Sequence, residues 1–367
     1  MFNSRYVGKP DYIILFCLAI LVFFGLVMLA SASSNQGQLR FGDPYYYLKH
    51  QILYGFFVGL VGFFFAMNFD YRNYRKAALF FGVLSIILLF LVFTPLGFKS
   101  GGAERWIRLG PITFQPAEIV KLTFILYLAA WLGNDKERAR SFTRGFLPFL
   151  AISGVISLLL LKQPSTSTVA ILMASALAIY FVSGAKMSYI AGIFLLGAIV
   201  LASVIYFTPY RLNRITNFLQ PDANPEAGGY HINQALIAIG SGGLFGVGYG
   251  QSTTKISYLP EAIGDSIFAV IGEELGFVGA AALIMVFLIF LVKTLWLSKK
   301  APDRFGKLIL IGFAALIGLQ AFVNIAAISG IIPLTGTPLP FISYGGTALV
   351  IFMTMGGIIT NISRYSR

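Results

Sequence analysis

The sequence predicts an all-α polytopic membrane protein with ten transmembrane helices and a long extracytoplasmic loop between the seventh and the eighth. Of its 367 residues, 57% are hydrophobic and only 11% are charged. Apolar runs of about 20 residues recur along the chain, which is the length of helix that crosses a ~30 Å hydrocarbon core. A soluble protein of this size would need a far more charged surface, so a soluble fold is excluded.

The ten expected spans are separated by polar connections. Each is expected to be helical, because an apolar segment in lipid satisfies its own backbone only as a helix. The first run is too long for the core of a cleaved signal peptide, so it counts as a span. We expect a single integral membrane domain over residues 1–367, with spans at about 12–32, 50–68, 77–94, 114–132, 145–162, 166–183, 187–208, 266–295, 308–330 and 341–361.

The basic residues indicate how the chain is oriented. The net charge is +13, but Lys and Arg lie mostly in short loops, with an excess on alternate ones. The positive-inside rule produces this pattern, and it places both termini in the cytoplasm. The same distribution argues against a nucleic-acid partner and is compatible with attraction to anionic membrane lipids. Cys17, the only cysteine, lies in the first span and is expected to be a packing residue.

With this orientation, three segments outside the membrane stand out. Residues 94–112, TPLGFKSGGAERWIRLGPI, form a loop rich in Gly and Pro before the fourth span. Residues 209–265 form the longest loop, whose middle part, 232–239, is apolar enough to lie in the membrane interface. Residues 329–346, SGIIPLTGTPLPFISYGG, carry no charge and leave little room for a helix. Irregular backbone at that depth requires contact with protein or with a water-filled cavity, so we expect a tight turn there.

The strongest candidate for chemistry is Asp265, at the outer boundary of the eighth span. Glu261 precedes it by four residues, a spacing that stacks the two carboxylates if the segment is helical. Two neighbouring carboxylates raise the pKa of one of them, which suits a general base. The alternative is that Asp265 only caps the following helix, since Asp is favoured at that position.

A second polar group is expected inside the fourth span. Glu118 and Lys121 are three residues apart, so they lie on one helix face. A buried pair of this kind either neutralises itself or belongs to a polar cavity, with Gln115 inside it and Arg105 and Trp106 of the preceding loop at its rim. Arg and Lys at such a place could clamp a pyrophosphate. Trp106 is equally suited to anchor the chain at the membrane interface.

Other polar features carry less weight. Glu273 and Glu274 are adjacent and so point to different sides of a helix, one toward the cavity and the other toward a neighbouring helix. His231 has no second histidine at metal-ligand spacing, so a zinc site is not expected and no metal ligands are assigned. The glycines of 240–250 imitate a nucleotide-binding loop, but no strand precedes them and no Lys-Ser/Thr follows. Close packing or a flexible loop is the better interpretation.

Four sequence blocks, in order and between correctly placed spans, are together highly specific. They are RWIRLGPITFQPAEIVKL, GYHINQALIAIGSGGLFGVGYGQ, YLPEAIGDSIFAVIGEELG and GIIPLTGTPLPFISYGGTALV, followed by a final NISR. Through them nearly the whole chain resembles the SEDS family of bacterial cell-envelope proteins (shape, elongation, division and sporulation). It looks most similar to the cell-division FtsW branch, with the elongation protein RodA as a near relative.

The resemblance implies an inverting peptidoglycan glycosyltransferase with ten spans in the bacterial cytoplasmic membrane. Such an enzyme polymerises lipid II and undecaprenyl-linked glycan at the outer membrane face, beside a class B penicillin-binding transpeptidase. The family's functional residues fall in this sequence on Asp265 as the key acid, on Arg105 and Trp106 as the Arg-Trp pair, and on Gln115, Glu118 and Lys121 as the QPxExxK motif.

The implied chemistry assigns roles to these residues. Asp265 would deprotonate the acceptor's 4-hydroxyl, with Glu261 beside it at the substrate, and the hydroxyl would displace undecaprenyl pyrophosphate. Arg105 and Lys121, or a divalent cation (Mg²⁺ or Mn²⁺) held by carboxylates, would stabilise the leaving group. No organic cofactor is expected.

Two departures from the family pattern keep other functions open. Where relatives often read PEAHTDFIF, this chain reads PEAIGDSIF, and where they read QPD it reads QPS at 163–165. The acid itself is kept. One alternative is a lipid II flippase, which ten spans and an intramembrane charged pair would suit. The other is a non-catalytic scaffold for the transpeptidase. The division and elongation branches share every motif used, so both roles stay open.

Overall fold

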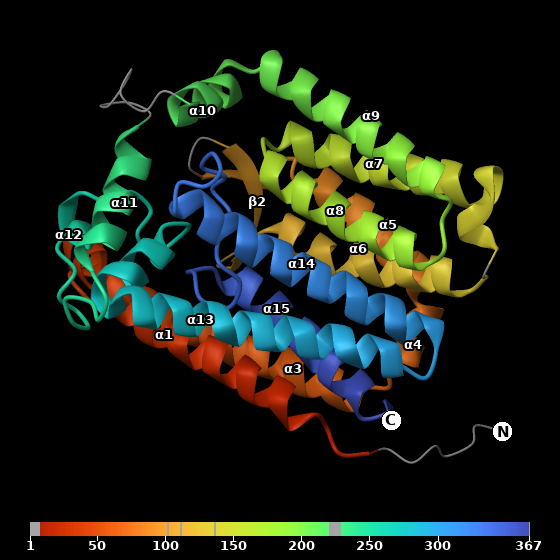
Figure 1. The fold of residues 1–367 in the computed structure, drawn as a ribbon, viewed down its shortest axis with the longest axis horizontal. Helices are drawn as coiled ribbons and strands as arrows, with labels where there is room; N and C mark the ends of the chain where they lie inside the picture. The colour runs from red at the N-terminus through yellow and green to blue at the C-terminus, as the bar shows by residue number, and fades with distance from the viewer. Residues whose placement is uncertain (1–7, 101–102, 111, 136, 220–228, 367) are drawn as a thin grey trace.

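The computed structural model describes residues 8–100, 103–110, 112–135, 137–219 and 229–366. Its long helices run roughly side by side and form an elongated bundle (Figure 1). In chain order the elements are α1 (Tyr12–Phe41), α2 (Tyr46–His50), α3 (Val58–Asn68), α4 (Arg72–Lys76), α5 (Ala78–Leu91), β1 (Gly97–Ser100), β2 (Ala103–Leu109), β3 (Ile112–Phe114), α6 (Pro116–Gly133), α7 (Leu147–Lys162), α8 (Thr166–Val182), α9 (Met187–Tyr206), α10 (Pro209–Leu219), α11 (Tyr230–Ser241), α12 (Thr254–Ser257), α13 (Ile267–Lys300), α14 (Arg304–Ile328) and α15 (Gly346–Ser363). Wider π-helical turns, Gln51–Phe57 and Phe142–Phe146, lead into α3 and α7, and Arg138–Arg140 form a short 3₁₀ turn.

The predicted all-α polytopic class is confirmed by the length and composition of the helices. Two shorter apolar helices, Ala78–Leu91 and Thr166–Val182, occupy the third and sixth expected spans. Eight helical stretches in the described part of the chain are long and apolar enough to cross a membrane: Tyr12–Phe41, Tyr46–Asn68, Pro116–Gly133, Phe142–Lys162, Met187–Tyr206, Ile267–Lys300, Arg304–Ile328 and Gly346–Ser363.

Helix α1 extends beyond its apolar run, so the end of an apolar run does not mark the end of a helix. Asp11 caps α1, since its Oδ1 accepts hydrogen bonds from the backbone N–H groups of Ile13 and Ile14 at 3.1 and 3.4 Å. The helix then continues to Phe41, well past the expected end at residue 32, and stops where Gly42 adopts a left-handed φ of 69°. The polar residues after 32 end the apolar run, but they remain compatible with helix.

Three helices form the buried centre of the bundle. In the most apolar stretches of α6, α14 and α15, 72%, 67% and 72% of the residues are buried. Helix α14 packs against α6, α8 and α13, and α15 packs against α3. By contrast, no residue of α9 is buried, and this helix lies at the edge of the bundle next to α10 (Figure 1). The apolar side chains of α9 are therefore left largely uncovered by the rest of the protein.

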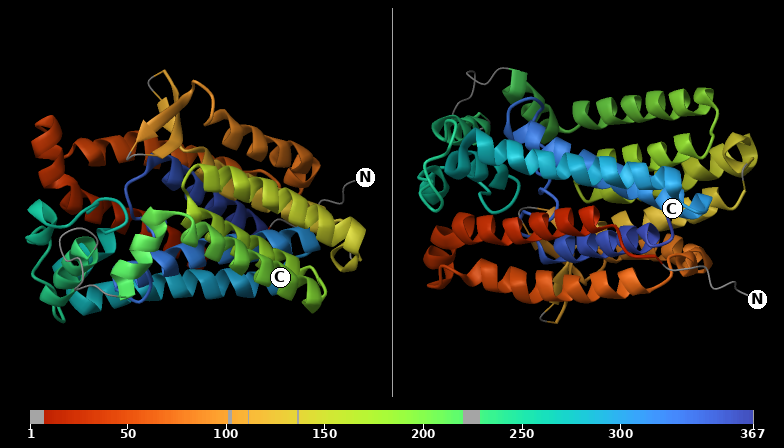
Figure 2. Two further views of the ribbon diagram at one scale, coloured as in Figure 1. Left: turned by 90° about the horizontal axis from the view of Figure 1, so that it is seen from above. Right: turned by 60° about the horizontal axis from the view of Figure 1, so that its bottom comes forward.

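The long segment 209–265 lies at one end of the bundle. It contains the helices α10, α11 and α12, and its residues 220–228 lie outside the described part of the chain. These helices and β2 are found at one end, whereas α4 and the end of α15 lie at the other (Figure 1, Figure 2). Helix α11 packs on α13, and its buried side chains are Ile232, Ala235 and Ala238.

The Gly- and Pro-rich segment 94–112 is not a plain loop, because it folds into a three-stranded antiparallel sheet of order β1-β2-β3. Phe98 pairs with Trp106, and Ile107 pairs with Phe114. Along β2, Ile107 is buried whereas Trp106 is half-buried and Arg108 is exposed, which is the alternation of a strand with one covered face. The composition of the segment concealed this alternation. Residues 101–102 and 111 lie outside the described part.

Helix α13 is interrupted at Gly276, whose φ of 65° and ψ of −167° are not helical. The glycine-rich segment 243–248 packs into the interruption and satisfies the backbone groups that it frees. Close packing is confirmed for Gly242 and Gly246, where a Cβ would lie 2.0 Å from Gly272 O and 2.1 Å from Glu274 O. Four hydrogen bonds join the two segments: Val247 N to Glu273 O (2.9 Å), Gly248 N to Glu274 O (3.1 Å), Phe277 N to Gly243 O (2.9 Å) and Val278 N to Leu244 O (3.1 Å).

Replacing Gly276 by Ala is expected to destabilise the fold. A Cβ at this position would lie 2.3 Å from the backbone nitrogen of Gly246. The backbone conformation alone costs about 1–3 kcal/mol for a residue other than glycine, and the clash adds to this. Thermal unfolding in detergent measures the effect. Gly240→Ala is the control, because a Cβ there meets nothing within 4 Å; an equal loss of Tm in both variants would contradict the expectation.

Candidate active site

Asp265 lies in the turn that leads into α13, one residue before the N-cap Ser266. Residues 261–266 form turns, and Glu261 has a positive φ of 49°. The expected helical stacking of Glu261 on Asp265 is therefore wrong, because regular helix begins only at Ile267. The capping position belongs to Ser266, so helix capping does not account for Asp265.

The side chain of Asp265 is half-buried, and one of its two carboxyl oxygens is covered by the protein. Its Oδ1 is buried and has no hydrogen-bond partner among the described residues. Burial, reinforced by the negative charge of Glu261 and opposed by the positive charge of Arg214, raises the pKa of Asp265 to about 7. A carboxyl group with a pKa near 7 can take up and release a proton at neutral pH, which is what a general base requires.

The backbone of the turn is held through three successive carbonyls, those of residues 263–265, each of which accepts a hydrogen bond. The carbonyl of Ile263 accepts from the backbone N–H of Tyr344 at 2.8 Å. The carbonyl of Gly264 accepts from Ser343 Oγ at 2.6 Å, and the carbonyl of Asp265 accepts from Asn324 Nδ2 at 2.8 Å. The uncharged segment 329–346 thus folds against the turn that carries Asp265. Its irregular backbone is in contact with protein, which is one of the two environments expected for it.

Arg214 of α10 lies across a small gap from Asp265. A Cβ built on Gly336 would lie 3.7 Å from Asp265 Oδ2 and 3.9 Å from both terminal nitrogens of Arg214. Arg214 also donates to the carbonyl of Leu334 at 3.1 Å. The side chains of Asp265 and Arg214 therefore both approach Gly336. Sequence reasoning counted Arg214 only as a loop charge, and nothing local distinguishes it from Arg211.

The predicted pair inside the fourth span is formed. Lys121 Nζ lies 2.6 Å from Glu118 Oε1, and both side chains are almost fully buried. Lys121 also donates to Gln320 Oε1 of α14 at 2.8 Å. The second oxygen of Glu118, Oε2, is buried without a hydrogen-bond partner among the described residues. The pair is thus joined to α14, the helix whose Asn324 holds Asp265.

The remaining predicted residues lie on β2 and at the start of α6. Arg105, on β2, donates from Nε to the carbonyl of Gln163 at 2.9 Å and from a terminal nitrogen to the carbonyl of Pro164 at 2.6 Å. Trp106 follows it in β2 and is half-buried. Gln115 is the N-cap of α6, and its backbone N–H donates to Thr347 Oγ1 at 3.4 Å. Arg105 therefore packs on the QPS turn.

Glu273 and Glu274 have structural contacts, and the expectation that one of them contacts a neighbouring helix is confirmed by Glu274 and Ser31 of α1. Glu273 accepts from Ser252 Oγ at 2.6 Å and from the backbone N–H of Thr253 at 3.0 Å. Glu274 accepts from Lys255 Nζ and from Ser31 Oγ of α1, both at 2.6 Å. The two carboxylates fix the segment 252–255 on α13, and one of them ties it to α1.

The side chains do not form a cage for a metal ion. No group of three or more His, Cys, Asp or Glu side chains gathers within the described ranges. His231 is close to Ser266 instead, with Nε2 at 2.7 Å from Oγ. The donor set of the described residues therefore does not fit a divalent cation held by protein carboxylates alone.

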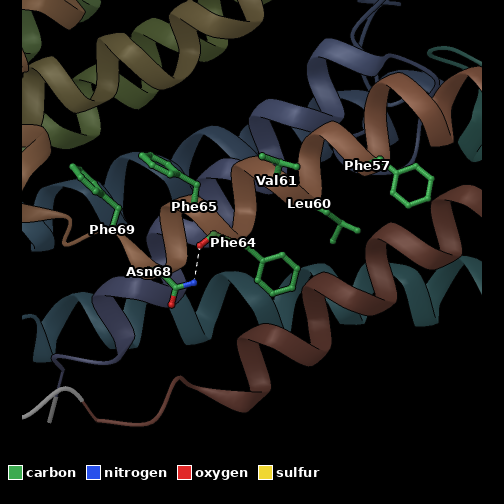
Figure 3. Close-up of a pocket in the computed structure, with 7 residues that line it drawn as sticks. All are labelled: Phe57, Leu60, Val61, Phe64, Phe65, Asn68 and Phe69. Carbon is green, nitrogen blue, oxygen red and sulfur yellow. Dashed lines mark hydrogen bonds between the residues drawn. The ribbon is translucent and has the colours of Figure 1, made fainter.

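A groove of about 810 Å³ on α3 is apolar and distinct from this group. Its lining carries no ionisable side chain: Phe57, Leu60, Val61, Phe64, Phe65, Asn68 and Phe69. Figure 3 shows these side chains along one helix, with the Asn68 amide turned back to the carbonyl of Phe64 at 2.9 Å. Such a surface suits contact with acyl chains and offers no group for catalysis.

Sequence and fold both match proteins of one known family. Residues 11–367 match the family of cell cycle proteins FtsW, RodA and SpoVE. The chain belongs to this SEDS family. It is 36% identical to the stage V sporulation protein E of Bacillus subtilis, over 98% of both chains. It is 38% identical to a probable peptidoglycan glycosyltransferase FtsW of a Geobacter species, over 99% of both.

Solved structures of SEDS proteins share the fold. One is a chain of a peptidoglycan synthase complex described as coordinating polymerization and crosslinking, with a TM-score of 0.81 and 27% identity, covering 97% of this chain and 98% of that one. Another is the rod shape determining protein RodA of Thermus thermophilus, with a TM-score of 0.72 and 28% identity over 97% of each chain. The SEDS resemblance drawn from the four sequence blocks is confirmed.

Proposed function

We propose that this SEDS protein is a peptidoglycan glycosyltransferase that polymerises lipid II into glycan strands at the outer face of the bacterial cytoplasmic membrane. The observation that carries the proposal is the half-buried Asp265 carboxyl, whose Oδ1 has no hydrogen-bond partner among the described residues and whose pKa is raised to about 7. The relatives support the same chemistry. The Geobacter FtsW is named a probable peptidoglycan glycosyltransferase, and the similar solved chain belongs to a peptidoglycan synthase complex.

In the proposed reaction, Asp265 takes the proton of the acceptor sugar's 4-hydroxyl. The freed oxygen forms a bond to the anomeric carbon of the growing chain, and the bond from that carbon to undecaprenyl pyrophosphate breaks. The pyrophosphate leaves with the bonding electron pair, and the proton passes from Asp265 to solvent. One displacement inverts the anomeric centre and needs no covalent intermediate, and positioning of the two substrates supplies much of the rate.

The leaving pyrophosphate needs positive charge around it. We assign this role to Arg214, across Gly336 from Asp265, and to Arg105, because a guanidinium group binds two phosphate oxygens at once. Lys121 was expected to share the role, but Glu118 and Gln320 hold it. Its proposed role is to shape the polar interior next to the substrate. The side chains of Gln115, Trp106 and Glu261 remain proposed substrate contacts.

The proposal includes a placement in the membrane. All ten apolar helices span it, α5 and α8 included, and both termini are cytoplasmic. The end that carries α10, α11, α12 and β2 then faces outward, where lipid II would be polymerised. Residues 1–367 form one integral membrane domain. A class B penicillin-binding transpeptidase is the proposed partner, since the similar solved chain comes from a complex that couples polymerization to crosslinking.

Polymerisation is expected to slow as the pH falls below about 7. The base must be ionised to accept a proton, and the pKa of Asp265 is raised to about 7. About half of the sites are then active at pH 7 and about one tenth at pH 6, whereas an ordinary aspartate would stay ionised down to about pH 4. Initial rates between about pH 5 and pH 8 measure this, and a rate that stays constant over that range would contradict it.

The test of the function is glycan-strand formation from purified lipid II, with and without a cognate transpeptidase. Polymer formed by the wild-type protein is the expected result. No polymer, combined with transport of lipid II across liposome membranes, would favour the flippase. No polymer and no transport, combined with stimulation of the transpeptidase, would favour the scaffold. The divalent cation stays a prediction, and the assay with chelator and with added Mg²⁺ or Mn²⁺ tests it.

A further inference from the structure

Two amide side chains of α14 hold the same loop from the bundle interior. Gln320 and Asn324 lie one helical turn apart, and each is 1% exposed. Asn324 Nδ2 donates both to the carbonyl of Asp265 at 2.8 Å and to the carbonyl of Thr337 at 2.7 Å. Gln320 Nε2 donates to the carbonyl of Pro338 at 2.9 Å. Two successive carbonyls of the loop are therefore fixed to two successive turns of α14.

We propose that Asn324 is a positioning residue for Asp265, whose backbone it holds in the place that a general base requires. The catalytic meaning of this proposal rests on the proposed function, because Asp265 is a base only if the protein transfers sugars. The geometric part does not depend on it. Asn324 would fix the backbone of Asp265 while making no contact with substrate.

The chemistry of the amide explains why this residue type suits the position. An asparagine amide nitrogen carries two N–H donors that point in different directions, so one side chain can serve two carbonyls. Leucine has nearly the same size and no donor, and an ionised aspartate only accepts. Without the amide, the part-buried bond to the Asp265 carbonyl and the buried bond to the Thr337 carbonyl would both be lost, which is unfavourable unless water replaces the donor. Water that enters for this reason also reaches the neighbouring carboxyl group.

The charged and titratable groups around Asp265 are not altered by a change at Asn324. They are Glu261 in the same turn, Arg214 on α10, and His231 on α11, which reaches Asp265's neighbour Ser266. Burial and the charge of Arg214 lower the pKa of His231, so it is neutral at pH 7. A change in the titration of Asp265 after substitution of Asn324 therefore reports on the position and the hydration of the carboxyl.

The test is an infrared titration of the Asp265 carboxyl in wild-type protein and in Asn324→Leu. The C=O stretch of the protonated carboxyl is assigned by its absence from Asp265→Asn. We expect the midpoint to fall by at least about one pH unit toward the ordinary value of about 3.9. We also expect kcat to fall about 100-fold with KM little changed, as for a reacting group misplaced by about 1 Å.

Asn361→Leu is the matched control. Asn361 is also 1% exposed, donates to the carbonyl of Met67 at 2.7 Å and accepts from the backbone N–H of Tyr71 at 3.1 Å. It holds backbone far from Asp265, so its loss should lower Tm and leave the midpoint unchanged. If Asn324→Leu does not fold, Ser343→Ala takes its place. It removes the donor to the Gly264 carbonyl and the acceptor of the Leu339 N–H, and a smaller shift in the same direction is expected.

The outcomes separate the two proposals. A midpoint that is unchanged in Asn324→Leu, or in Ser343→Ala where that variant replaces it, overturns the positioning role, whether or not polymer forms. An equal shift in Asn361→Leu overturns it as well, since the effect would then be general loosening. If the midpoint shifts in Asn324→Leu while the wild-type protein makes no polymer, the positioning of Asp265 is supported and the glycosyltransferase is rejected.

Discussion

Replacing Asp265 by Asn is expected to lower the rate of lipid II polymerisation by about 100- to 10,000-fold, the usual contribution of a general base. Asparagine keeps the size of the side chain but cannot accept the proton of the attacking hydroxyl. The substitution removes an ionisable group that is buried with an unpartnered oxygen, so the fold should keep its Tm. Polymer length and yield on gels, with the cognate transpeptidase present, measure the effect.

Asp43→Asn is a suitable control for this experiment. Asp43 follows α1 and forms an exposed ion pair with Lys49 at 2.7 Å. Its neutralisation should leave polymerisation unchanged, because exposed pairs contribute about 1 kcal/mol or less and Asp43 has no proposed role. Full activity of Asp265→Asn at unchanged Tm would reject the proposed base and leave the scaffold as the better explanation.

Replacing Lys121 by Met is expected to destabilise the protein by about 3–5 kcal/mol. The substitution leaves Glu118 buried without its counter-charge, and breaking a buried pair from one side costs about this much. It also removes the donor that Lys121 offers to Gln320. Thermal and denaturant unfolding in detergent measure the change. Lys49→Met, which breaks the exposed pair with Asp43, should change the stability by less than about 1 kcal/mol.

The double variant Glu118→Gln/Lys121→Met separates stability from activity. It contains no unpaired buried charge, so most of the lost stability should return. Its polymerisation rate should still be at least about tenfold below wild type, equivalent to about 1.4 kcal/mol of transition-state stabilisation, because the polar interior beside the substrate is gone. Full activity in this variant would mean that the pair only neutralises itself inside the helix bundle.

Hydropathy was enough to predict the helical scaffold, because burial in lipid imposes long apolar helices whatever their packing. Hydropathy was not enough to predict where helices end, or to predict the small elements outside the apolar spans. Helix α1 runs on to Phe41, since helix and membrane need not end together. The strand β2 escaped notice because only Ile107 of its alternating residues is covered, and the surrounding glycines and prolines favoured a loop.

The candidate site was predictable where residues stand out against their surroundings. Asp265 and the Glu118–Lys121 pair stand at apolar boundaries or inside apolar helix, so their charge drew attention. Gln320 and Asn324 are also polar residues within an apolar run, four residues apart, but as uncharged amides they are less conspicuous. Arg214 offered none, because its approach to Asp265 across Gly336 is set by tertiary packing of α10, which no local pattern encodes.

The uncovered helix α9 has a consequence for how this protein can change over time. Where no side chain is buried against a neighbour, selection can act on the apolar character of the helix but hardly on the identity of its residues. In α14 the opposite holds. A Cβ at Gly312 would lie 2.6 Å from side-chain atoms of both Ile125 and Ile179, so even one added carbon is resisted there. Drift should therefore exchange Leu, Ile, Val and Phe freely along α9 and leave the interior of α14 nearly fixed.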